Sequence, residues 1–270
     1  MKKFITRNWF TTTLFCLAAI AVSFGIYNII HVLLTHIHVE QRLAETIGRI
    51  IAGLGILIFF KTYFDIESFG FRRENFLKGI GIGGFMLLAT LNNLAGSLSE
   101  VAEYPVVSPS LYLLIIVIIE QIFVGVFEEF LFRGLVLNVL LAKIQNDRFK
   151  GKMEAIILSS FFFGAIHLLN LFSEPRMLNA TIAQVFYATF IGIFLGVLYL
   201  RTNNIWVVVF YHAIYDIVSE LPAIFHQIPV QEMADISIAD AVITAAFAFI
   251  FAPVGLFLAR KWRDTGSSKN

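Results

Sequence analysis

Ionisable side chains are rare in the apolar stretches of this sequence, and most of them fall in three short segments. Residues 127–133 read FEEFLFR, residues 163–167 read FGAIH, and residues 212–216 read HAIYD. An ionisable group inside an apolar span costs several kcal/mol unless it is paired or hydrated, so these segments predict a functional site.

The spacing within the segments predicts which side chains share a helix face. Glu129 and Arg133 are four residues apart, so they can pair on one face of a helix. Glu128 points about 100° away from Glu129 and is left out of that pair. His212 and Asp216 are also four residues apart, and both can face one cavity.

These residue types suit hydrolysis by an activated water molecule. A carboxylate beside an imidazole, here Glu128 with His167, can act as a general base. His212 and Asp216 can supply hydrogen bonds or charge to a developing oxyanion. We favour a reaction without a cofactor. The alternative is that Glu128, His167, His212 and Asp216 ligate a divalent metal such as zinc, although no HExxH motif is present.

Composition identifies the elements that must position these groups. The chain has 270 residues, of which 58% are hydrophobic and 14% charged, whereas soluble domains are about 25% charged. The net charge of +1 gives no indication of a nucleic-acid partner. We therefore expect an all-α polytopic membrane protein with the lipid bilayer as its surroundings, and a single transmembrane domain over residues 1–270.

Apolar runs of about 20 residues predict about eight transmembrane helices. Their approximate ranges are 10–34, 46–64, 78–97, 111–141, 154–172, 179–200, 204–220 and 238–260. We expect residues 10–34 to be a retained first span, because the run exceeds the roughly 7–15 residues of a signal-peptide core. The motif Gly79-Ile80-Gly81-Ile82-Gly83-Gly84 lies within a span, so Gly79 and Gly83 indicate helix packing rather than nucleotide binding.

The distribution of Lys and Arg predicts the orientation of the spans. With both termini in the cytoplasm, 16 of the 20 basic residues fall on the cytoplasmic side. Arg42, Arg49 and Arg176 fall on the other side, and Arg133 lies within a span. Because cytoplasmic loops collect basic residues, this orientation is the expected one.

The three motifs together resemble the CPBP family of CAAX proteases and bacteriocin-processing enzymes, also called the type II CAAX prenyl endopeptidase or ABI family. The family pattern is EExxxR, FxxxH and HxxxN or HxxxD, and it is matched by the three segments above. Weaker similarity lies at Asn204-Ile205-Trp206 and at Phe69-Gly70-Phe71-Arg72-Arg73. The resemblance covers a core of about residues 66–220.

The resemblance implies an intramembrane endopeptidase whose site opens to the cytoplasmic half of the membrane. By position, Glu128 and His167 would activate water, and His212 and Asp216 would stabilise the oxyanion. Glu129 and Arg133 would mainly hold the helix in place. Because Asp216 stands where some members have Asn, it must be protonated, paired or a metal ligand to serve there.

Function therefore has one leading hypothesis and two rivals. The leading one is a protease of a prokaryotic plasma membrane that acts on a peptide or membrane-protein substrate, with a possible link to bacteriocin processing or immunity. The first rival is a non-catalytic membrane scaffold or bacteriocin-immunity protein that retains the polar cluster. The second is a proton-coupled transporter, since intramembrane Glu and His also suit proton relays.

Overall fold

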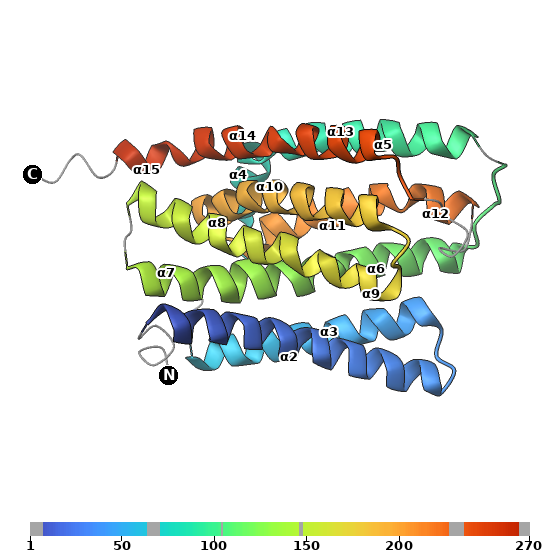
Figure 1. The fold of residues 1–270 in the computed structure, drawn as a ribbon, viewed down its shortest axis with the longest axis horizontal. Helices are drawn as coiled ribbons and strands as arrows, with labels where there is room; N and C mark the ends of the chain where they lie inside the picture. Colours follow the sequence, from blue (N-terminus) through green and yellow to red (C-terminus); the bar gives the residue numbers. More distant parts are fainter. Residues whose placement is uncertain (1–7, 64–70, 104, 146–147, 227–234, 265–270) are drawn as a thin grey trace, which may run out of the picture. The chain divides into compact units, whose positions relative to one another are not determined.

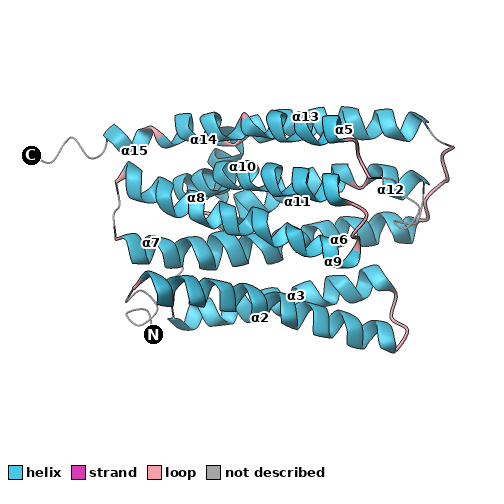
Figure 2. Cartoon of the chain, viewed as in Figure 1, coloured by secondary structure: helices cyan, strands magenta, loops and turns pink. Residues whose placement is uncertain are grey.

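The chain folds into helices, as the composition predicts. The computed structural model describes residues 8–63, 71–103, 105–145, 148–226 and 235–264, and none of these residues lies in a strand (Figures 1 and 2). The all-α class is thereby confirmed.

Six helical stretches in the described ranges are long and apolar enough to cross a membrane. They are Trp9–His36 (α2), Leu111–Ile144, Phe149–Ser173, Leu178–Thr202 (α10), Ile205–His226 and Ile238–Ala259. A seventh candidate is the pair α4 (Arg73–Ile82) and α5 (Gly84–Glu103), which is bent by 63°. The predicted span 46–64 corresponds to the continuous helix α3 (Gln41–Tyr63). The chain is thus a multi-pass membrane protein, while eight spans and cytoplasmic termini stay predictions.

Several of these stretches contain more than one element. Leu111–Ile144 comprises α6 (Leu111–Glu129), the π-helix η2 (Phe130–Leu137) and α7 (Asn138–Ile144). Phe149–Ser173 comprises α8 (Phe149–Ile166), the 3₁₀ turn η3 (His167–Leu169) and α9 (Asn170–Ser173). The remaining elements are α11 (Ile205–Ser219), α12 (Leu221–His226), α13 (Ile238–Phe249), α14 (Phe251–Ala259) and α15 (Lys261–Asp264).

The chain divides into two compact units, which we describe separately. Unit 1 consists of Met1–Lys2, Thr13–Leu135 and Thr202–Ile228, and unit 2 of Lys3–Thr12, Val136–Arg201 and Pro229–Asn270. A single domain over residues 1–270 therefore stays a prediction.

In unit 1, α6 packs against α3 and α11, and α11 also packs against α4 and α5. Two glycines permit these approaches. A Cβ on Gly125 of α6 would lie 3.2 Å from the carbonyl oxygen of Val209 on α11. A Cβ on Gly79 of α4 would lie 2.5 Å from the side chain of Val207. The predicted packing role of Gly79 is confirmed.

A side chain on α11 forms a hydrogen bond to the backbone near the bend between α4 and α5. Gly83 ends α4, and its N–H bonds to the carbonyl of Gly79 at 2.8 Å. The hydroxyl of Tyr211 donates to the carbonyl of Ile80 at 2.6 Å. A backbone carbonyl within a membrane must find a donor, so Tyr211 stabilises the bend.

In unit 2, α8 and α10 approach closely where Gly164 faces Thr189 and the carbonyl of Val185. The N-terminus of α10 is capped by Asp235, a residue distant in sequence. Its carboxylate accepts hydrogen bonds from the N–H groups of Asn179 and Ala180 at 2.7 and 2.9 Å. These donors belong to the first turn of the helix, where backbone N–H groups have no partner within the helix.

Candidate active site

The first element of the site is the start of α11, which carries His212 and Asp216. Asn204 is fully buried, and its side-chain oxygen accepts the N–H of Trp206 at 3.0 Å, so it caps the helix. Its amide nitrogen donates to the carbonyl of Arg72 at 3.2 Å. This hydrogen bond joins the two segments of weaker family similarity, residues 204–206 and 69–73. Phe69 and Gly70 of the second segment lie outside the described residues.

The second element is the junction of α6 and η2, which carries Glu128, Glu129 and Arg133. The spacing predicts a regular α-helix here, but residues Phe130–Leu137 form a π-helix. Such π segments often occur at functional sites, because the wider turn redirects side chains. Arg133 nevertheless pairs with Glu129 as predicted, with Nη1 2.9 Å from Oε1.

Glu129 also bonds to His212, a contact that spacing within one segment does not predict. The Nδ1 atom of His212 lies 2.7 Å from Oε1 of Glu129, so this single oxygen serves both Arg133 and the imidazole. Both side chains of the predicted pair are buried, with exposed fractions of 2% for Arg133 and 0% for Glu129. Glu129 therefore orients the histidine as well as bonding within its own helical segment.

The other ring nitrogen of His212 faces two carboxylates. Its Nε2 atom lies 3.2 Å from Oδ2 of Asp216 and 3.5 Å from Oε2 of Glu128. Asp216 is thus paired, which meets one of the conditions under which an Asp could serve at this position. In contrast to Glu129, Glu128 and Asp216 are partly exposed, at 17% and 25%.

These contacts restrict where protons can be. A carboxylate oxygen and a bare ring nitrogen are both acceptors, so each short contact to His212 needs a proton between its two atoms. Either both ring nitrogens carry a proton, or one of the neighbouring carboxyl groups does. The contacts therefore imply a shared proton at His212, whose Nε2 lies 3.5 Å from Glu128, and general acid–base chemistry needs such a proton.

His167, the remaining predicted site residue, belongs to unit 2. It follows the last residue of α8, and its Nδ1 atom lies 2.9 Å from the carbonyl of Phe163, to which it donates when this nitrogen is protonated. The ring of Phe163 contacts the imidazole edge-on at 5.3 Å between centroids. In that tautomer Nε2 is an acceptor. That Nε2 of His167 faces Glu128 stays a prediction.

The alternative of a metal site gains no support from the geometry. Within the described ranges, no group of three or more His, Cys, Asp or Glu side chains is arranged to hold a metal ion. His212 in particular has carboxylate oxygens at hydrogen-bonding distance from both of its nitrogens.

Unit 1 contains a second charged cluster, which we call the arginine network. It consists of Arg42, Arg49, Glu45, Glu120 and Glu220. Arg42 Nη1 lies 2.6 Å from Oε2 of Glu120, and Arg49 Nη1 lies 3.3 Å from Oε1 of Glu120. Arg42 also contacts Glu220 at 3.2 Å, and Arg49 contacts Glu45 at 3.1 Å.

The arginine network accounts for two basic residues on the side expected to be poor in them. Arg42 and Arg49 lie on α3 and pair with carboxylates, in particular with Glu120 on α6. Glu120 lies two turns before Glu128 on the same helix. The network thus links α3 to the helix that carries the site.

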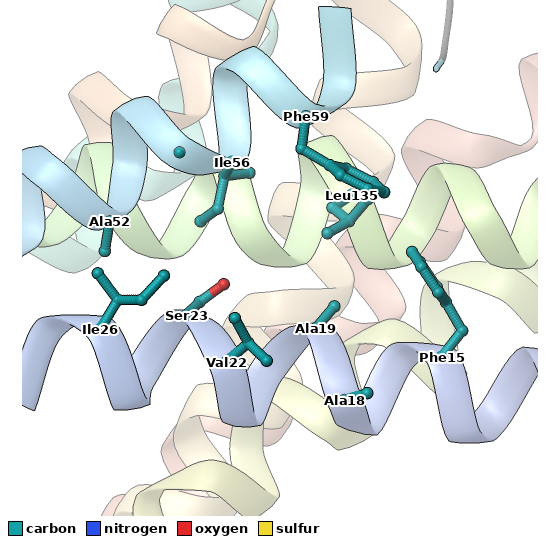
Figure 3. A pocket seen from close by; sticks show the side chains of 11 residues that line it. Phe15, Ala18, Ala19, Val22, Ser23, Ile26, Ala52, Ile56, Phe59 and Leu135 are labelled. Atoms are coloured by element: carbon teal, nitrogen blue, oxygen red, sulfur yellow. The ribbon is translucent and has the colours of Figure 1, made fainter. Parts of the chain in front are cut away.

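An apolar cavity of about 360 Å³ lies between α2 and α3 in unit 1 (Figure 3). Phe15 and Val22 on α2 face Ile56 and Phe59 on α3, and the hydroxyl of Ser23 is the one side-chain polar atom among the labelled residues. The cavity lacks the acids and bases of the polar cluster, so we do not assign catalysis to it.

Comparison with known proteins agrees with the motifs. Residues 110–218 match the family model described as Rce1-like, "Type II CAAX prenyl endopeptidase Rce1-like". The matched segment includes the three main motifs and lies within the core of about residues 66–220. Neither a curated protein nor a solved structure matches the chain. The family resemblance inferred from the motifs is confirmed over this segment.

Proposed function

We propose that this chain, which carries an Rce1-like type II CAAX prenyl endopeptidase segment over residues 110–218, is an intramembrane endopeptidase. The observation that carries the proposal is the surroundings of His212. Its two ring nitrogens contact Glu129 on one side and Asp216 and Glu128 on the other. A transmembrane chain gains little stability from three carboxylates around one imidazole, whereas acid–base catalysis needs such a group.

Glu128 is the proposed general base. It is partly exposed, so a water molecule can reach it, and its carboxylate can take the proton as that water attacks a peptide carbonyl. His167 is proposed to assist from unit 2, with Nδ1–H held by the carbonyl of Phe163 and Nε2 as the acceptor.

His212 is the proposed oxyanion donor. With a proton on Nε2, the imidazole can donate to a tetrahedral oxyanion that forms beside Glu128 and Asp216, the two groups this nitrogen faces. Asp216 stabilises the charge on the imidazole. Glu129, bonded to Nδ1 and supported by Arg133, is a positioning residue, because it reaches the reaction only through His212.

The proposed substrate is a peptide or the membrane segment of another protein, cleaved near the cytoplasmic side of a prokaryotic plasma membrane. A bacteriocin-like leader or an immunity-related membrane protein fits such a membrane better than a prenylated CAAX protein does. The side of entry is tested by adding a substrate peptide to inverted and to right-side-out membrane vesicles and measuring its cleavage. Faster cleavage in inverted vesicles would support entry from the cytoplasmic side.

The test of the activity is cleavage of a quenched-fluorescent peptide library by purified protein in detergent. We expect Glu128→Gln and His167→Ala each to lower the cleavage rate by about 10²–10⁴-fold, the usual contribution of a general base. Glu154→Gln, a change at an exposed glutamate of α8, is the matched control and should cleave at the wild-type rate.

Each variant is also assayed with a chelator and after zinc addition. Activity that survives chelation supports a glutamate-activated water, and loss that zinc restores would return Glu128, His167, His212 and Asp216 to the role of metal ligands. A folded wild type without activity, together with a Glu128→Gln variant that keeps its cellular function, would contradict the proposal and favour the scaffold.

A further inference from the structure

Unit 2 contains a polar cavity, several of whose lining residues follow His167 in the chain. Its volume is about 450 Å³, and it is lined mainly by α9 and α10, with Ile236 and Thr244 closing one side. Its polar lining includes Asn170, Ser173, Thr181 and Gln184. Of the lining residues, Asn170 is the nearest to His167 in the chain, one 3₁₀ turn after it.

Two amide side chains in this cavity are bonded to each other in a way that leaves the oxygen of one and the nitrogen of the other without a partner in the pair. Asn170 Nδ2 donates to Gln184 Oε1 at 2.9 Å. Asn170 is exposed and Gln184 partly buried, and Oδ1 of Asn170 and Nε2 of Gln184 make no hydrogen bond to any residue that the structure describes. If both amides were assigned in the opposite orientation, one donor and one acceptor would still remain.

An extended peptide backbone matches this pair. The N–H and C=O of one residue in an extended chain point to the same side, and a partner that offers an acceptor beside a donor satisfies both. A substrate segment must leave its helix before a peptide bond can be attacked. Inside a membrane, the backbone groups freed in this way have no water to bond and need partners from the protein.

Contacts outside the amide pair connect one wall of the cavity to α10. Asp235 caps the first turn of α10 and accepts the N–H of Ile236 at 2.9 Å, and Asn179 Nδ2 donates to the carbonyl of Ile236 at 2.9 Å. These bonds fix the Ile236 wall against α10. Among the described lining residues, Glu174 carries the one carboxylate, and there is no Lys or Arg. This lining suits an uncharged or basic segment better than an acidic one.

We propose that the cavity lined by α9 and α10 binds the backbone of an extended, non-acidic segment of the substrate peptide through Asn170 and Gln184. This inference rests on the proposed function, because it names a subsite for its substrate. The α9–α10 loop contains Arg176 and is predicted from the charge distribution to be non-cytoplasmic. The bound segment would therefore be the part of the substrate on that side of the scissile bond.

The test measures binding first, so that it does not depend on cleavage. Peptides are selected from a random fluorescent library by binding to the Glu128→Gln protein, and their Kd values are measured by anisotropy. Asn170→Leu and Gln184→Met, which keep side-chain size, should each raise Kd about 2- to 10-fold through one lost hydrogen bond. The controls Asn28→Leu and Gln41→Met change exposed amides in unit 1 and should leave Kd unchanged.

A backbone N-methyl scan of the bound peptide then identifies the N–H that contacts Asn170. Methylation at that position should raise the Kd for the Glu128→Gln protein. In the double variant Glu128→Gln/Asn170→Leu, the methylated and unmethylated peptides should bind with equal Kd, as in a double-mutant cycle. In the protein with Glu128 intact, the same two variants should raise KM and leave kcat unchanged.

Unchanged Kd in both variants, or an N-methyl effect that persists without the Asn170 amide, would overturn the inference, as would failure of the library to bind at all. Absence of cleavage by wild type with the expected Kd changes would instead refute only the proposed activity. The two failures are therefore distinguishable.

Discussion

Oε1 of Glu129 lies 2.7 Å from Nδ1 of His212, although the two residues are 83 positions apart in the chain. The same oxygen accepts a bond from Arg133 at 2.9 Å, so a buried arginine, a buried carboxylate and an imidazole form one continuous chain of hydrogen bonds. Such a chain fixes the ring of His212 with Nε2 directed to Glu128 and Asp216. Glu129 therefore contacts one ring nitrogen of His212, and its neighbour Glu128 faces the other.

The first prediction concerns the buried pair. Arg133→Met should destabilise the protein by about 3–5 kcal/mol, because it leaves the carboxylate of Glu129 buried without its cation. The double variant Arg133→Met/Glu129→Leu should regain most of that stability but not the cleavage activity, since His212 loses its orienting bond. Thermal unfolding in detergent and peptide cleavage are measured in parallel. Full activity in the double variant would contradict the positioning role of Glu129.

The second prediction concerns the approach of α6 to α11. Gly125→Ala places a Cβ 3.2 Å from the carbonyl oxygen of Val209, which forces the two helices apart by a few tenths of an ångström. Since Glu128 and His212 lie on these helices, we expect kcat to fall more than KM rises. Gly81→Ala is the control, because a Cβ there meets nothing within 4 Å. Equal kcat and KM values for the two variants would show that the close packing of α6 and α11 does not determine the geometry of the site.

The third prediction concerns the arginine network. Glu120→Leu removes the common partner of Arg42 and Arg49. Since Arg42 keeps Glu220 and Arg49 keeps Glu45, we expect a loss of about 1–3 kcal/mol in stability. Glu154→Leu, at an exposed residue of α8, should unfold like wild type. Unfolding is followed by denaturant titration of the purified protein, and equal midpoints for the two variants would contradict the prediction.

The fourth prediction concerns acid stability of the α10 cap. Asp235 lies outside the spans, and its pKa is lowered: desolvation opposes this shift, but hydrogen bonds from Asn179, Ala180 and Ile236 outweigh it. Because the folded-state pKa is below the unfolded value, the stabilisation is present above the unfolded pKa and is lost as the pH falls through the folded pKa. Asp235→Asn should therefore lower the melting temperature at neutral pH and flatten its dependence on acid pH. Thermal melts across this range check both effects, and parallel curves for the two proteins would refute them.

Some features of the fold follow from local sequence alone. Hydropathy places a helix at each predicted span, because an apolar run of this length must satisfy its backbone internally in a bilayer. The pairing of Glu129 with Arg133 also follows from spacing within one segment. The π-helix over Phe130–Leu137 does not, since the widened turn depends on what packs around it.

The sequence by itself determined the class of protein, the three motifs and the residues available for chemistry. Tertiary structure decided which of them meet. Glu129 contacts His212, and Glu120 contacts Arg42 and Arg49, because packing across glycines such as Gly125 brings distant helices together. The physical reason is that helix periodicity sets which residues share a face, whereas the partner of that face depends on side-chain shape and buried charge along the whole chain.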